Sequence, residues 1–203
     1  MINTIIFDFG NVFIDLDIEN GFQESLKTLG ISTLSKDIID INKLYETGSI
    51  STDDFINFYA EKFPHLTKVE LIDLWNVILK DFPKHRLDFL KQLKSENRYQ
   101  LILLSNTNEL HIDWIKEHVP FYEDFKNCFD AFYLSHDINL RKPNADIFEF
   151  VLNTNNLNAE NCIFIDDNAD NIETAKHLGI KTWHITPCKE DVVNLFSSKK
   201  HLF

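Results

Sequence analysis

The sequence TIIFDFGNV, residues 4–12, leads an apolar run directly into Asp8, which is followed by a phenylalanine and Gly10. A short run that is apolar on both faces is typical of a strand buried inside a parallel sheet. A strand that only filled the core would not need a carboxylate at its end. In open α/β sheets, ligands bind outside the carboxyl ends of the strands, so Asp8 is the first candidate for a functional residue.

Strand-like runs recur along the chain, and each later run follows a helical-looking stretch. Strands that alternate with helices predict an α/β fold, in which a Rossmann-like parallel sheet carries helices on both faces. The runs cover Asn3–Phe7, Tyr99–Leu104, Ala131–Leu134, Cys162–Ile165 and Lys181–Ile185.

The segment Asp15–Phe82 contains no clear strand and reads as a helical insert. Within it, Ser51 is followed three residues later by an acid, which predicts a helix start. We expect an α/β core made of residues 1–14 and 84–203, with an all-helical cap of residues 15–83 inserted after the first strand. The expected helices of this insert cover Asn20–Leu29, Lys36–Tyr45, Thr52–Phe63 and Lys68–Asp81.

The composition limits the partners that the protein can have. The 203-residue chain has 32 acidic and 20 basic residues and a net charge of −12, which argues against a broad basic face for nucleic acid. The longest apolar runs have only the length of a strand, so we expect no membrane span. No secretory signal is recognised, and three widely spaced cysteines predict a reducing cytoplasm. The oligomeric state is left open between a monomer and a homodimer.

Polar residues also follow the later strands. The carboxyl ends of parallel strands meet at one edge of a sheet, so we expect these side chains and Asp8 to face one crevice. The second run is followed by Ser105 and Asn106, the third at a short distance by Lys142, and the fourth by Asp166 and Asp167.

The acidic residues of this set predict a metal site. Carboxylates that converge without a partner repel one another. Mg²⁺ resolves this repulsion, because it prefers oxygen ligands and binds through one or two carboxylates together with water and substrate phosphate. We therefore expect Asp8 and Asp167, assisted by Asp166, to hold Mg²⁺, with the carbonyl oxygen of Gly10 as a further ligand.

The same groups suit phosphoryl transfer. A free oxygen of Asp8 can attack phosphorus and form an aspartyl-phosphate that water later hydrolyses. Ser105 can donate a hydrogen bond to phosphate, and Lys142 adds a positive charge. The backbone amides after Ser105 begin the next helix and suit an anion. We therefore expect Ser105, Asn106 and Lys142 to bind a small phosphorylated metabolite.

Taken together, the motifs resemble those of the haloacid dehalogenase superfamily over nearly the whole chain. The stretches FDFGNV, LLSNTN, RKP and FIDDNADNIETAKHLGI occur in that family's order. The resemblance implies Asp8 as the nucleophile, Asp167 as the chief metal ligand of the last stretch, and Ser105 and Lys142 on the phosphate. It also implies subfamily IA, whose C1 helical cap lies where the insert does. Within the family, the motifs are most similar to a bacterial α-D-glucose-1-phosphate phosphatase-like subgroup.

One residue departs from the family's pattern. Most phosphatases of this family carry a second aspartate two residues after the nucleophile, and Gly10 stands at that position. A missing general acid costs about 10²–10⁴-fold in rate. The anomeric oxygen of a sugar 1-phosphate needs less protonation, so a sugar phosphate such as glucose 1-phosphate is favoured. Asp15, Asp17 and Glu46 are left open as substitute acids.

Two other functions are left open. A 2-haloacid dehalogenase needs no proton for its halide leaving group, but the insert has no arginine to hold a halide. A non-catalytic module that binds phosphate or a sugar phosphate would have no reason to retain Asp8, Lys142 and Asp167 together. The residues therefore favour a magnesium-dependent phosphatase.

Overall fold

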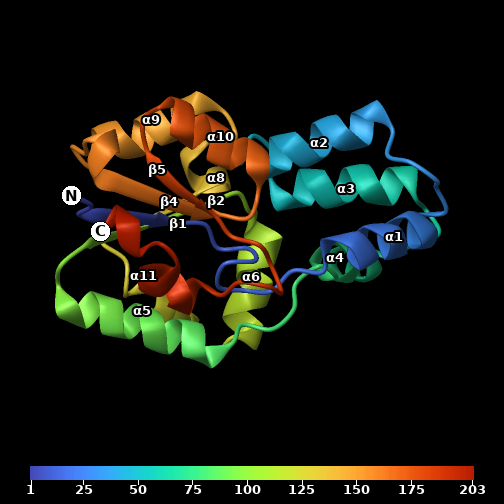
Figure 1. The fold of residues 1–203 in the computed structure, drawn as a ribbon. Helices are drawn as coiled ribbons and strands as arrows, with labels where there is room; N and C mark the ends of the chain where they lie inside the picture. Colours follow the sequence, from blue (N-terminus) through green and yellow to red (C-terminus); the bar gives the residue numbers. More distant parts are fainter.

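A five-stranded sheet with the strand order β3-β2-β1-β4-β5 lies at the centre of the molecule, in a computed structural model that describes all of residues 1–203 (Figure 1). Every pair of neighbouring strands is parallel, which confirms the predicted α/β fold. All strand bounds lie within one residue of those predicted. The strands are β1 (Thr4–Phe7), β2 (Gln100–Ser105), β3 (Ala131–Leu134), β4 (Cys162–Asp166) and β5 (Lys181–His184).

Helices cover both faces of the sheet, because successive side chains of the buried strands point to opposite faces. Ile5 and Phe7 pack into one apolar cluster with α5, α6, α7 and α11, whereas Ile6 packs into another with α9 and α10 (Figure 1). These helices are α5 (Lys84–Glu96), α6 (Glu109–His118), α7 (Tyr122–Lys126), α9 (Ala145–Thr154), α10 (Ala169–His177) and α11 (Leu195–Ser198).

Phenylalanine rings fix the chain that follows the first strand. The ring centroid of Phe13 lies 5.0 Å from that of Phe125 and 6.1 Å from that of Phe129, and Phe9 stacks on Phe125 at 4.9 Å. Aromatic pairs at such distances stabilise by about 0.5–1.5 kcal/mol beyond burial alone. Because Phe9 and Phe13 are anchored in the core, the backbone beside Asp8 is held in place.

Four helices are inserted between β1 and α5, and they lie beside the edge of the sheet where the strands end (Figure 1). They pack around an apolar cluster of their own. In this cluster Tyr45 stacks on Phe55 with ring centroids 4.1 Å apart, and Trp75 lies edge-on to Phe55 at 4.7 Å. The helices of the insert are α1 (Ile18–Leu29), α2 (Lys36–Glu46), α3 (Thr52–Lys62) and α4 (Lys68–Asn76).

Local sequence signals fix the ends of these helices. The side chain of Ser51 accepts a hydrogen bond from the backbone N–H of Asp54, which confirms the predicted start of α3. Thr67 and Glu70 form a reciprocal capping box before α4. Gly30 ends α1 with a φ of 69°, in the left-handed region that glycine adopts readily.

The last helix of the insert is shorter than predicted. The sequence pattern extends it to Asp81, but α4 ends at Asn76. Beyond α4, the chain turns back along the segment that enters the insert. The backbone N–H of Asp15 donates to the carbonyl of Asp81, and Leu16 pairs with Leu79 in an antiparallel bridge. These tertiary hydrogen bonds replace helical ones, so the two connections between core and insert run side by side.

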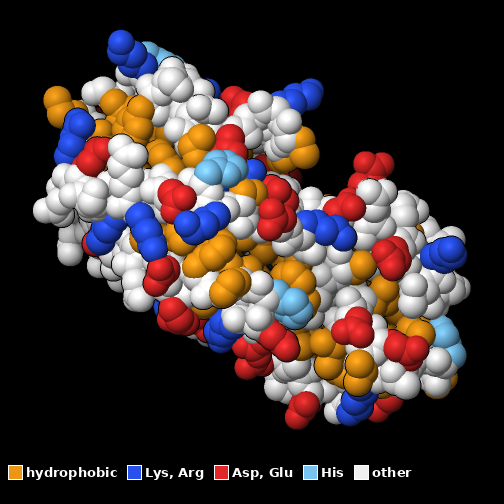
Figure 2. Space-filling model, turned by 90° about the horizontal axis from the view of Figure 1, so that it is seen from below, with side chains coloured by type: hydrophobic (Ala, Val, Ile, Leu, Met, Phe, Trp, Pro, Cys, Tyr) orange, Lys and Arg blue, Asp and Glu red, His pale blue; other side chains and the backbone are white.

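The remaining elements are short. They are α8 (Ser135–Ile138) and the 3₁₀-helices η1 (Ala159–Asn161), η2 (Val192–Asn194) and η3 (Lys200–Leu202). None of the helices combines the length and the apolar character that a membrane crossing requires. On the face shown in Figure 2, acidic side chains are interspersed with lysine and arginine side chains and with apolar patches.

Candidate active site

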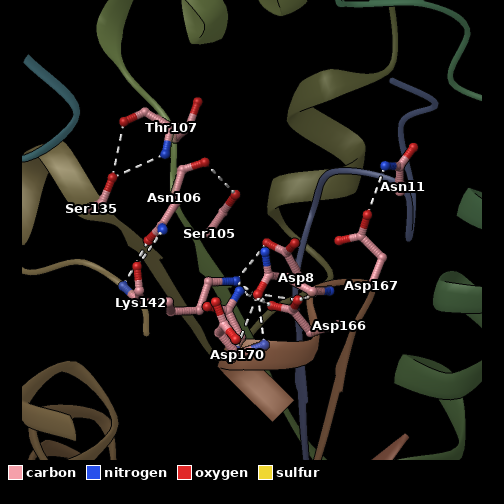
Figure 3. Close-up of polar contacts among 12 residues, drawn as sticks. Asp8, Asn11, Ser105, Asn106, Thr107, Ser135, Lys142, Asp166, Asp167 and Asp170 are labelled. Carbon is pink, nitrogen blue, oxygen red and sulfur yellow. Dashed lines mark hydrogen bonds and ion pairs between the residues drawn. The ribbon is translucent and has the colours of Figure 1, made fainter. Parts of the chain in front are cut away.

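Three carboxylates meet where β1 and β4 end. The two strands are neighbours, with Phe7 opposite Ile165, so the residues that follow them emerge at one edge. Asp8, Asp166 and Asp167 each offer an oxygen atom, and these atoms lie within 4.8 Å of one another (Figure 3). The structure thus brings together the three aspartates that the sequence predicts as metal ligands.

Lys142 is buried among these carboxylates. Its Nζ lies 2.8 Å from Oδ1 of Asp8 and 2.7 Å from Oδ2 of Asp166, and its side chain is 1 % exposed. Asp166 is fully buried, and Asp8 nearly so. Three acidic groups therefore share one lysine, and the cluster keeps an excess of negative charge when all its members are ionised.

Burial and mutual repulsion shift the pKa values of these groups. Burial raises the pKa of Asp8 to about 7, an effect that Lys142 opposes and that Asp166 and Asp167 reinforce. Burial also raises the pKa of Asp167. Burial disfavours the charge on Lys142, but Asp166 and Asp8 outweigh it and raise the lysine's pKa. Because the donors are all carboxylate oxygens in negative excess, the cluster fits a hard divalent cation such as Mg²⁺.

Neighbouring amides orient the acidic residues. Asn171 donates to both carboxylate oxygens of Asp166, at 3.1 and 3.0 Å. Nδ2 of Asn11 donates to Oδ2 of Asp167 at 2.7 Å, while Oδ1 of Asn11 accepts from the backbone N–H of Leu16. Partners of this kind tune metal affinity, because they fix the ligand's orientation.

Ser105 ends β2 on the other side of Asp8, and Asn106 follows it (Figure 3). Ser105 is 3 % exposed, and its hydroxyl makes one long contact, 3.5 Å to the carbonyl of Asn106. The side-chain amide of Asn106 donates to the carbonyl of Lys142 at 2.8 Å and accepts from its N–H at 2.9 Å. The side chain of Asn106 thus positions Lys142, while contact of Ser105 and Asn106 with phosphate stays a prediction.

Gly10 lies in the wall of a crevice of about 140 Å³, which residues of both the core and the insert line. A Cβ on Gly10 would lie 2.7 Å from Cδ1 of Leu16. A side chain at position 10 would therefore require the end of the Leu16 side chain to move. Metal binding by the carbonyl of Gly10 stays a prediction.

The end of α2 and the loop after it, residues 46–51, contact the core beside this crevice. Oε2 of Glu46 lies 2.9 Å from a guanidinium nitrogen of Arg141. Nδ2 of Asn139 donates to the carbonyl of Thr47 at 2.7 Å. The hydroxyl of Ser135 accepts from the backbone N–H of Thr107 and lies 2.6 Å from the carbonyl of Glu46. One buried hydroxyl thus links the loop after β2 to the insert.

A second contact joins α4 to α6. The indole N–H of Trp75 donates to Oδ1 of Asn108 at 3.1 Å, and Nε2 of His111 lies 3.1 Å from the carbonyl of Trp75. Burial lowers the pKa of His111 to about 4, so the imidazole is neutral near pH 7 and Nε2 carries the proton that the carbonyl accepts. The contact holds the insert against the loop that follows β2.

Two residues of this site escape motif reasoning. Asn11 has a φ of 54°, a left-handed conformation that asparagine tolerates in turns. The sequence therefore indicates a turn at Asn11, but not the hydrogen bond from the Asn11 side chain to Asp167. Ser135 follows β3 directly and is fully buried. Its position at a strand end is the same signal that identified Asp8, Ser105 and Asp166, and it could have been found in that way.

Relatives of known identity share this architecture. The D-ribitol-5-phosphate phosphatase of Bacteroides thetaiotaomicron is 28% identical over 191 residues, which cover 90% of this chain and 91% of the relative. The magnesium complex of a haloacid dehalogenase family enzyme from the same organism has a TM-score of 0.84 and 30% identity, covering 96% of this chain and 98% of that one. A structure of the wild-type enzyme with magnesium and inorganic phosphate has a TM-score of 0.80 and 30% identity, covering 97% and 100% of the two chains.

The family model of the haloacid dehalogenase-like hydrolases matches residues 2–179. This range begins before β1 and ends after α10, so it includes Asp8, Ser105, Lys142 and the acidic pair. The match agrees with the parallel sheet, the helical insert and the clustered carboxylates described above. The chain therefore belongs to the haloacid dehalogenase-like hydrolases.

Proposed function

We propose that the protein is a magnesium-dependent phosphatase that hydrolyses a small phosphate monoester through an aspartyl-phosphate on Asp8. The observation that carries this proposal is the placement of Asp8 between a buried lysine and an acidic pair, with Nζ of Lys142 2.8 Å from its Oδ1. The phosphatase relative and the magnesium and phosphate complexes of a family enzyme support it.

Each residue has a role in this proposal. A carboxylate oxygen of Asp8 attacks phosphorus, and Lys142 and Ser105 bond to the phosphoryl oxygens. Asp8, Asp166 and Asp167, with the carbonyl of Gly10, hold Mg²⁺, which supplies positive charge beside the phosphoryl group when bound. Asn106 keeps Lys142 in place through its backbone. The insert excludes water from the crevice while the aspartyl-phosphate forms.

The substrate that we favour is a sugar or sugar-alcohol phosphate. The relative named for D-ribitol 5-phosphate supports this class. Glucose 1-phosphate is one member of this class. We favour it because its anomeric oxygen leaves with less protonation than the oxygen of an ordinary alcohol. Glu46, which lines the crevice and has one carboxylate oxygen without a protein partner, offers a hydrogen-bond partner for a hydroxyl group.

An apolar cavity favours a second candidate class, in which the alcohol carries an apolar part. The cavity of about 190 Å³ lies among the helices of the insert and is lined mainly by apolar side chains, including Phe22 and Trp75. It shares Glu46, Ile78 and His111 with the crevice beside Gly10. An aryl or alkyl phosphate could therefore place its phosphate at Asp8 and its apolar group in this cavity.

A hydrolysis screen with Mg²⁺ tests the proposal. Glucose 1-phosphate, glucose 6-phosphate, ribitol 5-phosphate and phenyl phosphate are compared, and Asp8→Asn is assayed beside the wild type. Phosphate release that the variant lacks supports the phosphatase. Chloride release from 2-chloropropionate would instead identify a dehalogenase, and tight binding of a sugar phosphate without turnover would identify a binding module.

A further inference from the structure

Position 10 lacks the acid that a phosphatase of this family uses to protonate its leaving group, and the structure distinguishes the possible substitutes. Asp15 is paired with Arg86, whose guanidinium nitrogen lies 2.7 Å from Oδ1. The side chain of Asp17 caps α1 and accepts from Asn20. Neither aspartate lines the crevice, so both are assigned to structural roles.

Glu46 is the only acidic residue that lines this crevice, which Gly10 and Ser105 also line. Its Oε2 bonds to Arg141 at 2.9 Å, whereas no protein group bonds to Oε1. Arg141 immediately precedes Lys142 in the chain. The ion pair therefore ties a carboxyl group of the insert to the segment that carries the buried lysine, and leaves one oxygen free for a ligand.

The surroundings of Glu46 suit a group that exchanges a proton. Burial raises its pKa, although the guanidinium of Arg141 and the ammonium of Lys43 oppose this rise. The other titratable residue that lines the crevice is His111, whose pKa burial lowers to about 4, so it carries no proton to give at neutral pH beyond the one bonded to Trp75. A carboxyl group whose Oε2 accepts from Arg141 can still carry a proton on Oε1.

We propose that Glu46 donates the proton to the leaving alcohol and later accepts one from the attacking water, in place of the acid missing at position 10. This inference rests on the proposed phosphatase function. Arg141 acts through Glu46 as a positioning residue, because it bonds to one carboxylate oxygen of Glu46, whereas the other oxygen has no protein partner.

Both steps balance. In the first, an oxygen of Asp8 bonds to phosphorus, the bond from phosphorus to the ester oxygen breaks, and the Glu46 proton moves to that oxygen as the alcohol leaves. In the second, the Glu46 carboxylate takes a proton from water, the water oxygen bonds to phosphorus, and the bond from phosphorus to Asp8 breaks. Inorganic phosphate leaves, Asp8 is again a carboxylate, and Glu46 again carries its proton.

The test compares leaving groups in wild type and Glu46→Gln. Glycerol 2-phosphate releases a basic alkoxide that needs a proton, whereas p-nitrophenyl phosphate releases a stable phenolate that does not. We expect Glu46→Gln to lower kcat for glycerol 2-phosphate by about 10²–10⁴-fold, and kcat for p-nitrophenyl phosphate by less than about tenfold. Equal losses on both esters, or no loss on either, would overturn the proposed role.

Further variants separate this inference from the proposed function and from misfolding. Glu46→Asp retains a carboxyl group and is expected to keep more activity on glycerol 2-phosphate than Glu46→Gln; the reverse order contradicts a proton-transfer role. Asp17→Asn is the control for an acid outside the crevice and is expected to affect both esters equally. If the wild-type protein hydrolyses none of the esters, the proposed function itself is contradicted. If the wild type is active and the Glu46 variants keep its activity, only this inference is contradicted.

Discussion

A Cβ atom on Gly48 would lie 2.0 Å from the carbonyl oxygen of His136. The φ of Gly48 is 64°, so glycine is required here both by backbone conformation and by space. The loop after α2 thus approaches the backbone of α8 more closely than any other residue type allows. This contact brings Glu46 and Thr47 to the core.

Gly48→Ala is therefore expected to separate the loop from α8 and to lower kcat/KM. A misplacement of about 1 Å at such a site costs on the order of 10²-fold in rate. Gly30→Ala is the matched control, since its φ is 69° but nothing lies within 4 Å of its added Cβ. Urea unfolding should show a loss of about 1–2 kcal/mol for the left-handed alanine in Gly30→Ala, and a larger loss in Gly48→Ala, whose Cβ also meets the backbone of His136. Equal kcat/KM values for the two variants would contradict a steric role of Gly48.

Asn11 is expected to govern magnesium affinity without binding the metal. Asn11→Gly keeps the left-handed backbone conformation and removes the amide that orients Asp167. We expect the Mg²⁺ concentration for half-maximal activity to rise about 10–100-fold. Asn97→Gly is the control, because Asn97 has a φ of 51° at the end of α5 and lies outside the acidic cluster. An unchanged magnesium requirement in Asn11→Gly would contradict the role.

Magnesium is expected to stabilise the fold as well as to support activity. The cluster of Asp8, Asp166 and Asp167 shares one lysine, so a bound cation relieves repulsion that only the folded state experiences. At a free concentration of about 100 Kd, Mg²⁺ adds about 2.7 kcal/mol. The rise in melting temperature on adding Mg²⁺ should be lost in Asp167→Asn and kept in Asp170→Asn, which removes an exposed acid from the first turn of α10. Identical shifts in both variants would argue against the site.

His111 is expected to destabilise the protein in mild acid. Burial lowers its folded-state pKa from 6.5 to about 4, so between these values the unfolded chain binds a proton that the folded chain excludes. The free energy of unfolding therefore falls as pH decreases through this window, by at most about 3 kcal/mol. Urea unfolding at several pH values should show a smaller fall for His111→Gln than for wild type or for His201→Gln, an exposed control. Parallel curves for all three proteins would exclude this effect.

The strands and the residues at their ends could be predicted because each depends on a short local pattern. TIIF before Asp8 and CIFI before Asp166 combine a buried strand with a polar exit, and parallel pairing then brings the exits together. The predicted last helix of the insert continues beyond Asn76, where α4 ends. The strand-like pairing of Leu16 with Leu79 outweighs the helix propensity of the residues after Asn76. No local pattern contains that partner, since it lies far away in the sequence.

Contacts between insert and core were not predictable for the same reason. The pairing of Glu46 with Arg141 joins residues 95 positions apart, and neither residue carries a motif for the other. The bonds of Asn106 to Lys142 also depend on how two loops meet after folding. The sequence left Glu46 open as one of three substitute acids, and only the lining of the crevice separated it from Asp15 and Asp17.

The paired connections at Leu16 and Leu79 have an evolutionary consequence. The chain leaves the sheet and returns to it at adjacent points, and the helices between them pack on their own apolar cluster. A different helical module could therefore be spliced in at this junction without disturbing strand register. Descendants of one ancestral hydrolase could diversify their selectivity by exchanging this module, while the nucleophile and the acidic loop stay unchanged.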